Sequence, residues 1–328
     1  MKKLLLIFLL INLLKAGIIE DNYSNELKTN TFKIFDENFD EALAFFDYLC
    51  FQFPEEPVGF FGKASLFSAM GDHYESKTYR DSAQSYYKLV IDKSDLILQN
   101  IKDANDPWIY FYKGASLSNE GFYNGKNGSF FSALSNILEG MDYIEKSLEL
   151  DENFLPSKFI LGGYIYYKSK ITSWIYDRRS DGIEMIKDTA YKENISQYFA
   201  LAALIWIYID EEKFSKAIEL SDIGLIQFQD SRYFMWGKAK ALICDEKFDQ
   251  AEIVYKKILD QVKNDKIESP LNETMCFMRL SKIYYELGNN KLSIDYFGKI
   301  NLKRLSEDQL DKIDDEYKSL EKKISAKK

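Results

Sequence analysis

Apolar and polar residues alternate along this chain with the spacing of α-helices. Apolar residues often lie three and four positions apart, as Leu310, Ile313, Tyr317, Leu320 and Ile324 do, and this spacing forms one face of a helix. Alternation of β-branched with polar residues, which marks strands, is rare. Five prolines and sixteen glycines are few for 328 residues, and both residue types weaken helix interiors. The pattern therefore predicts an all-α protein.

A short segment recurs along the chain with a fixed period. The segment Glu212-Lys-Phe-Ser-Lys-Ala217 returns as Glu246-Lys-Phe-Asp-Gln-Ala251, an offset of 34 residues. Related copies are Glu37-Asn-Phe-Asp-Glu-Ala42 and Gly288-Asn-Asn-Lys-Leu-Ser293. Each copy lies between two apolar helical runs, so we expect a helical hairpin with polar residues at its turn. One hairpin cannot bury its apolar faces alone, so neighbouring hairpins must stack.

The small residue that ends each copy predicts where two helices cross closely. We place these crossings at Ala42, Ala83, Gly140, Gly182, Ala217, Ala251 and Ser293. Spacings of 34 and 35 residues join the crossings at 182, 217 and 251, whereas the others are 41, 42 or 57. The longer spacings imply longer helices or inserted loops. We expect the largest loop at residues 118–129, where Asn, Gly and Ser cluster, and a second near residues 262–270.

These residues resemble the tetratricopeptide repeat (TPR), a family of helical hairpins with a period of 34 residues. Residues 279–288 resemble the first helix of a repeat, and Leu161-Gly162 matches the Leu-Gly pair of that helix. The segments 51–54 and 148–153 resemble the end of its second helix. The resemblance implies an all-α, right-handed superhelical solenoid of about seven antiparallel helix pairs. It is specific for fold and says little about function.

The start of the chain has the pattern of a signal peptide at residues 1–16. Lys2 and Lys3 precede the run Leu4–Leu14, and the small residue Ala16 follows it. The run is shorter than the roughly 20 residues of a typical membrane-spanning helix and fits the apolar core of a signal peptide. We therefore expect export to the periplasm or secretion. An uncleaved N-terminal membrane anchor is the alternative, and no later segment is apolar enough to span a bilayer.

The rest of the chain divides into a repeat domain and a charged end. We expect the TPR-like domain at residues 17–300 and a charged capping helix at residues 301–328. Ser306 and Gln309 have the spacing of a capping box, which starts a helix. This helix would cover the exposed apolar end of the solenoid.

The charge and the cysteines exclude some functional classes. The formal net charge is −9, and an acidic chain repels phosphate backbones, so we expect no nucleic-acid partner. The three cysteines form no CxxC pair and predict no disulfide framework, although a bridge between Cys244 and Cys276 stays open.

The sequence offers no constellation for catalysis. His73 is the only histidine, in Gly71-Asp-His-Tyr74, and we expect it to be a solvated turn residue. No clustered His or Cys predicts a metal site, and no glycine-rich loop follows a strand to hold phosphate. We therefore expect no enzyme, no cofactor and no metal.

The resemblance implies that the first helix of each hairpin lines a concave groove. Projected onto this chain, the groove holds Phe61, Trp108, Phe111, Phe159, Tyr166, Phe199, Trp206, Tyr233, Trp236, Lys240, Lys282 and Tyr285. This set is mostly aromatic, with Lys240 and Lys282 as isolated basic residues. It departs from the basic clamp with which the family holds acidic peptide tails. The aromatic residues contact either a ligand or only one another, and the sequence leaves both open.

Two functions fit these observations. The first is a non-catalytic protein–protein interaction scaffold or adaptor, exported to the cell envelope, that binds an envelope protein or peptide on the concave aromatic face. The alternative is a solenoid that binds a small molecule, glycan or lipid in an aromatic groove. The sequence does not predict the oligomeric state.

Overall fold

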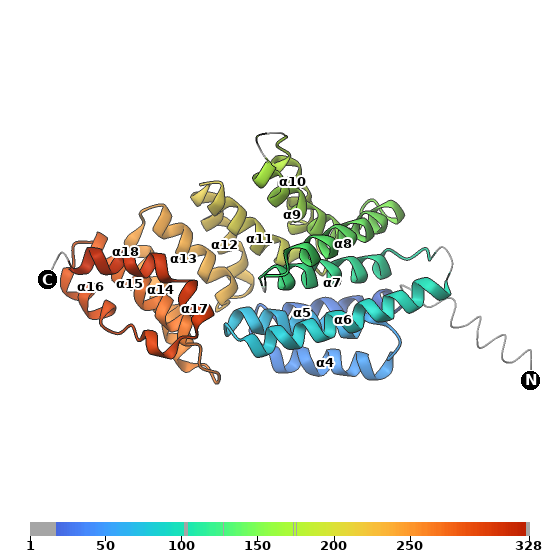
Figure 1. Ribbon diagram of the computed structural model, residues 1–328, viewed down its shortest axis with the longest axis horizontal. Helices are drawn as coiled ribbons and strands as arrows, with labels where there is room; N and C mark the ends of the chain where they lie inside the picture. Colours follow the sequence, from blue (N-terminus) through green and yellow to red (C-terminus); the bar gives the residue numbers. More distant parts are fainter. Residues whose placement is uncertain (1–17, 102–103, 127, 173, 175, 326–328) are drawn as a thin grey trace, which may run out of the picture. The chain divides into compact units, whose positions relative to one another are not determined.

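The computed structural model describes residues 18–101, 104–126, 128–172, 174 and 176–325. The predicted signal peptide, residues 1–16, lies outside the described residues. Every regular element of the described part is helical, and no strand occurs among these residues (Figure 1). The predicted all-α fold is therefore confirmed.

The helices follow one another along the chain and pack against their sequence neighbours. They are α2 (Ile18–Asn22), α3 (Ser24–Phe32), α4 (Phe39–Gln52), α5 (Pro57–His73), α6 (Lys77–Asn100), α7 (Pro107–Lys126), α8 (Phe130–Leu150), α9 (Leu155–Thr172), α10 (Arg179–Ala190), α11 (Gln197–Asp210), α12 (Phe214–Gln227), α13 (Arg232–Cys244), α14 (Phe248–Asn264), α15 (Pro270–Glu286), α16 (Asn290–Phe297), the short η1 (Leu302–Arg304), α17 (Glu307–Asp311) and α18 (Asp314–Ser325).

The chain forms two compact units. The first unit holds residues up to Met70 together with Lys77–Ala203, and the second unit holds Gly71–Ser76 and Leu204–Lys328. The boundary predicted between residues 300 and 301 separates the repeat domain from the capping helix, not one compact unit from another. It stays a prediction.

The recurring turn has a defined backbone geometry. Glu37, Glu212, Glu246 and Gly288 have φ angles of 59°, 56°, 56° and 74°, which is the left-handed region. The Glu246 N–H donates to the carbonyl oxygen of Ile243 (3.2 Å), and the Lys247 N–H donates to the carbonyl oxygen of Leu242 (2.9 Å). This pair of hydrogen bonds is the Schellman motif that ends helices. Glu75, with φ 51°, adds a further left-handed turn that the sequence comparison missed.

The predicted helix crossings are confirmed, because all seven small residues are buried. A Cβ atom added to Gly140 would lie 2.7 Å from the carbonyl oxygen of Gly114. At Gly182 the same atom would lie 2.5 Å from the carbonyl oxygen of Gly162. The two backbones meet at these points, so only a small residue fits there.

The predicted loop at residues 118–129 is wrong, because α7 continues to Lys126. Two of its three glycines, Gly121 and Gly125, lie within α7, whereas Gly128, with φ 84°, lies in the turn before α8. A Cβ atom at Gly121 would lie 2.8 Å from the carbonyl oxygen of Ala133 on α8. Asn, Gly and Ser cluster here because α8 lies close against α7. The second predicted loop is shorter than expected, since α14 ends at Asn264 and α15 begins at Pro270.

The C-terminal helices cap the second unit as predicted. The Ser306 hydroxyl accepts a hydrogen bond from the Gln309 N–H, and the Gln309 side chain accepts one from the Ser306 N–H, which completes the capping box. Ile313, Leu320 and Ile324 are buried in a cluster that includes Leu271 and Met278 of α15.

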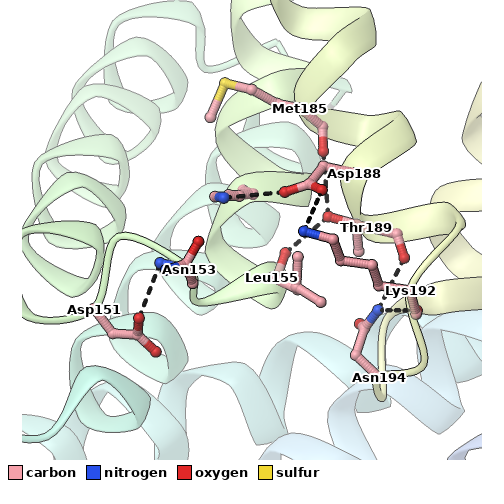
Figure 2. A network of polar contacts seen from close by, with 9 residues as sticks. Asp151, Asn153, Leu155, Met185, Asp188, Thr189, Lys192 and Asn194 are labelled. Atoms are coloured by element: carbon pink, nitrogen blue, oxygen red, sulfur yellow. Dashed lines mark hydrogen bonds and ion pairs between the residues drawn. The ribbon is translucent and has the colours of Figure 1, made fainter.

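Polar contacts fix the base of the α9–α10 hairpin, as Figure 2 shows. The Thr189 hydroxyl on α10 donates to the carbonyl oxygen of Leu155 at the start of α9 (3.0 Å). The Asp188 carboxylate forms ion pairs with Lys158 on α9 (3.0 Å) and with Lys192 (2.5 Å). Asn194 donates to the carbonyl oxygen of Thr189 (2.9 Å). These bonds tie both helices to the loop that follows them.

We predict opposite effects for two adjacent glycines of α9. Gly162→Ala should lower the free energy of unfolding by about 1–3 kcal/mol, because the added methyl group overpacks a backbone contact. Gly163→Ala should raise it by about 0.5–1 kcal/mol, because nothing lies within 4 Å and alanine favours the helix. Urea denaturation of both full-length variants measures the difference. Equal changes would contradict the close crossing.

The left-handed turn gives a second prediction. Glu246→Gly should raise the free energy of unfolding by about 0.5–1 kcal/mol, because glycine adopts this backbone without the steric penalty of a Cβ atom. Glu219→Gly, on the exposed face of α12, is the matched control and should lower it by about 1 kcal/mol. Both values come from urea denaturation, and a destabilised Glu246→Gly variant would refute the account of the turn.

Candidate functional site

The projected aromatic residues of the first unit pack against one another. Phe61 lies 5.4 Å from Phe111 between ring centroids, and Trp108 lies 5.8 Å from Phe111. Trp108 also contacts Phe154 edge to face at 4.7 Å. Phe111 is buried, and Tyr166 is fully buried on α9. These contacts are typical of a hydrophobic core. The ligand-binding role of these residues stays a prediction.

The other projected aromatic residues lie in varied surroundings. Phe199 is half-buried against Phe35, with ring centroids 4.8 Å apart. Trp206 on α11 is exposed. In the second unit, Trp236 lies 6.0 Å from Tyr255. The remaining members, Phe159, Tyr233 and Tyr285, are half-buried.

Lys240 and Lys282 belong to one basic cluster together with Arg279. Lys240 lies on α13, and Arg279 and Lys282 lie on α15. Burial, followed by the nearby Arg279, lowers the pKa of the Lys240 ammonium. Burial, Arg279 and Lys240 together lower the pKa of Lys282. The interpretation of the two lysines as isolated is therefore wrong, because stacked first helices bring distant positions together.

Two cations of this basic cluster form no ion pair with a described carboxylate. Arg279 forms an ion pair with Glu316 of α18. Lys323 of α18 pairs with Glu286 at 3.1 Å and lies 5.3 Å from the ring centroid of Tyr285. Lys240 and Lys282 have no ion pair among the described residues, although both are half-buried. The basic cluster can therefore accept an anionic group from outside.

A cavity of about 150 Å³ lies beside Arg279. Its lining is Glu75, Leu271, Met275, Met278, Arg279, Lys312, Ile313 and Glu316. The Lys312 ammonium pairs with Glu75 at 2.5 Å, so the charged lining residues already have partners. Pockets for ligands usually enclose about 300–1,000 Å³, and this one is too small for a glycan or a lipid chain.

His73 is buried, contrary to the expectation of a solvated turn. It is 8% exposed, because Gly71–Ser76 packs within the second unit. Arg232 forms two hydrogen bonds to Asp265, at 2.6 and 2.8 Å, and also contacts Nε2 of His73. Since guanidinium only donates, Nε2 must be the unprotonated nitrogen. Burial and the charge of Arg232 lower the pKa of His73 to about 3.

The neutral His73 gives a pH prediction. The unfolded chain binds this proton near pH 6.5, whereas the folded chain binds it near pH 3. Below pH 6.5 the unfolded state therefore gains protons first, and the contribution of His73 to stability is lost as the pH falls. Between about pH 7 and about pH 5 this loss should be about 2 kcal/mol.

The matched variant is His73→Gln, whose amide oxygen can still accept from Arg232 but does not titrate. Urea denaturation at both pH values should show a smaller loss of stability for this variant than for the wild type. An equal loss in the two proteins would contradict a buried, neutral His73.

A buried carboxyl cluster in the first unit carried no signal in the sequence. Tyr112 donates a hydrogen bond to Glu20 at 2.8 Å. Burial raises the pKa of Glu20 to about 7, with smaller contributions from Asp106 and Glu56. Burial also raises the pKa of Asp106, whose Oδ1 accepts the N–H of Trp108 at the start of α7. By accepting this N–H, Asp106 stabilises the start of α7.

Other chemistry finds no support in the described part of the chain. No group of three His, Cys, Asp or Glu side chains there is arranged to hold a metal ion. Cys50, Cys244 and Cys276 are free thiols, so the bridge between Cys244 and Cys276 is absent. None of the described helices combines the length and the apolar character needed to cross a bilayer.

Comparisons with solved structures find other helical-repeat proteins. The C-terminal part of a TPR repeat-containing protein from Cytophaga hutchinsonii is 13% identical, over 88% of this chain and 98% of that one, with a TM-score of 0.47. IFIT1, solved as a monomeric mutant with Gppp-AAAA, is 13% identical over 80% of this chain and 55% of that one, with a TM-score of 0.49. BtubC from P. vanneervenii is 11% identical over 81% and 88% of the two chains, with a TM-score of 0.34. The sequence matches no family model and no curated protein. The paired helices, the left-handed turns and the 34-residue repeat show that the described chain has a TPR-like helical-repeat fold.

Proposed function

We propose that this protein is a non-catalytic binding scaffold whose second unit holds an acidic segment of a partner protein. The observation that carries the proposal is the pair Lys240 and Lys282, half-buried beside Arg279 and without an ion pair among the described residues. A half-buried ammonium group that forms no ion pair is unfavourable. A carboxylate that reached both lysines would relieve this, with charge-assisted hydrogen bonds.

The rest of the chain makes this basic cluster selective for an acidic partner. Asp and Glu outnumber Lys and Arg by nine over the whole chain, so most of the surface repels an acidic segment. Trp236 lies four positions before Lys240 on α13, and Tyr285 lies three positions after Lys282 on α15, so each aromatic residue shares a helix face with its lysine. Aromatic residues suit the centre of a protein interface. A long RNA would meet repulsion outside the basic cluster, which favours a protein segment.

The start of the chain supports export as part of the proposal. Residues 1–16 have the pattern of a signal peptide, so the partner would be a protein of the cell envelope. An N-terminal membrane anchor would place the scaffold in the same compartment. Fractionation of cells that express the tagged chain distinguishes a cleaved soluble form from an anchored one.

The alternative, a small molecule, glycan or lipid in an aromatic groove, has less support. Phe61, Trp108 and Phe111 contact one another, and the cavity beside Arg279 is about 150 Å³. Neither offers an aromatic groove deep enough to enclose such a ligand.

The test is crosslinking with mass spectrometry on the tagged chain in native cells. Lys240→Glu/Lys282→Glu should reduce the recovery of the partner protein by about tenfold or more, because two favourable charge contacts become repulsive. The matched control is Lys291→Glu/Lys303→Glu, which changes the net charge equally at two exposed positions. The control should recover the partner as the wild type does.

Two outcomes would contradict the proposal. If both double variants recover the same proteins in equal amounts, the basic cluster is not the binding site. If the purified wild type binds single-stranded RNA and the Lys240→Glu/Lys282→Glu variant does not, the ligand is a nucleic acid.

A further inference from the structure

The outer face of α8 is apolar in its first half and acidic in its second half. Six residues of α8 follow one another in steps of three and four positions, so their side chains share one face of the helix. All of them are exposed. They are Phe131, Leu134, Leu138, Asp142, Glu145 and Glu149, and we call them the α8 stripe.

The opposite face of α8 is already used for packing. A Cβ atom at Gly121 of α7 would lie 2.8 Å from the carbonyl oxygen of Ala133, and one at Gly114 would lie 2.6 Å from that of Gly140. Ile144 is fully buried. Because these contacts hold α8 against α7, the α8 stripe is presented by a fixed helix rather than by a loop.

The apolar half of the α8 stripe displays large side chains to solvent. Phe131 is 87% exposed, and Leu134 and Leu138 are each 45% exposed. Phe130, at the start of α8, is also exposed, and its ring lies 5.9 Å from that of Phe131 between centroids. Neighbouring apolar side chains on an exposed helix face mark an interaction surface.

The acidic half of the α8 stripe lacks the cations that would balance it. Residues 139–152 hold six carboxylates and one basic residue, Lys146, which pairs with Glu149 at 2.8 Å. Asp142 and Glu145 form no ion pair among the described residues. The last turn of α8 has no basic residue, although the C-terminal end of a helix favours cations. A cationic partner would therefore neutralise both the carboxylates and the helix end.

The order of the two halves selects the class of partner. The acidic half repels an anionic bilayer and RNA. A second copy of the chain does not fit either. Two α8 stripes in parallel would set carboxylates against carboxylates, and two in antiparallel would set carboxylates against apolar side chains, which leaves them desolvated and unpaired.

We propose that the α8 stripe binds a basic amphipathic helix of a partner protein. Apolar side chains of that helix would pack on the apolar half, and its Lys or Arg side chains would pair with the acidic half. The α8 stripe spans residues 131–149, roughly 27 Å at about 1.5 Å per residue, so the matching helix has about five turns. The proposal is independent of the basic cluster at Lys240 and Lys282, which lies in the second unit.

Fluorescence anisotropy of labelled synthetic peptides, titrated with the purified full chain, tests the proposal. Each peptide has about 20 residues, with leucines at helical spacing in one half and lysines in the other. Two such peptides differ in which half comes first, and at least one of them should bind. It should bind about tenfold more tightly than the same peptide with serines in place of its leucines, and high salt should weaken it.

One pair of variants tests the apolar half of the α8 stripe. Phe131→Ser/Leu138→Ser should lower the affinity for the peptide about tenfold, because two exposed apolar contacts are lost. The matched control is Ile226→Ser/Ile253→Ser, which removes two apolar residues of the second unit that are 80% and 70% exposed. The control should bind the peptide as the wild type does.

A second pair tests the acidic half. Asp142→Lys/Glu145→Lys should lower the affinity about tenfold or more, because two attractive charge contacts become repulsive. The matched control is Glu219→Lys/Asp260→Lys, which changes the net charge equally at two exposed positions of the second unit. This control should bind as the wild type does, and so should Lys240→Glu/Lys282→Glu, which separates this test from that of the basic cluster.

Several results would overturn the proposal. Failure of both peptides to bind would do so, as would equal affinities in the variants of the α8 stripe and their controls. Equal binding of the serine peptide would show that the apolar half is not used. Self-association of the wild type that Phe131→Ser/Leu138→Ser abolishes would instead assign the α8 stripe to a second copy of the chain.

Discussion

Two helices of a hairpin can lie side by side only where neither backbone carries a large side chain at the crossing. In this protein a Cβ atom at Gly182 would lie 2.5 Å from the carbonyl oxygen of Gly162. At another crossing, the hydroxyls of Ser281 and Ser293 each donate to the other residue's carbonyl oxygen at 2.8 Å. The close approach leaves no room for a wide connection. The left-handed residue that follows the first helix, such as Glu212 or Gly288, is the consequence, since it reverses the chain within a few residues.

The same stacking decides which side chains meet at a distance in the sequence. Lys240 and Lys282 are 42 positions apart, yet, after burial, the nearby Arg279 lowers the pKa of each lysine. The periodicity predicts that first helices share a face, so both lysines could be projected onto it. The projected groove did not include Arg279. It did not include Glu316 either, because the terminal helix that carries Glu316 follows the repeats and has no counterpart in their period.

Where sequence reasoning failed, the deciding contacts were not local. Glycine, asparagine and serine at residues 118–129 have the composition of a loop, but the surface of α8 makes Gly121 a contact residue within a helix. His73 ends α5, where a solvated position is the usual outcome. Arg232, 159 positions away, and Asn272, which donates to the His73 carbonyl oxygen at 2.7 Å, bury it instead. Crossings and turns could be predicted because their cause lies within one hairpin. These contacts could not, because residues far along the chain create them.

The basic cluster of Lys240, Arg279 and Lys282 is unfavourable for the chain alone. It keeps two half-buried ammonium groups, those of Lys240 and Lys282, without an ion pair among the described residues. The close crossings at Gly140 and Gly182 and the apolar cluster of the second unit are formed by other residues. An anionic group that reached both ammonium groups would relieve this.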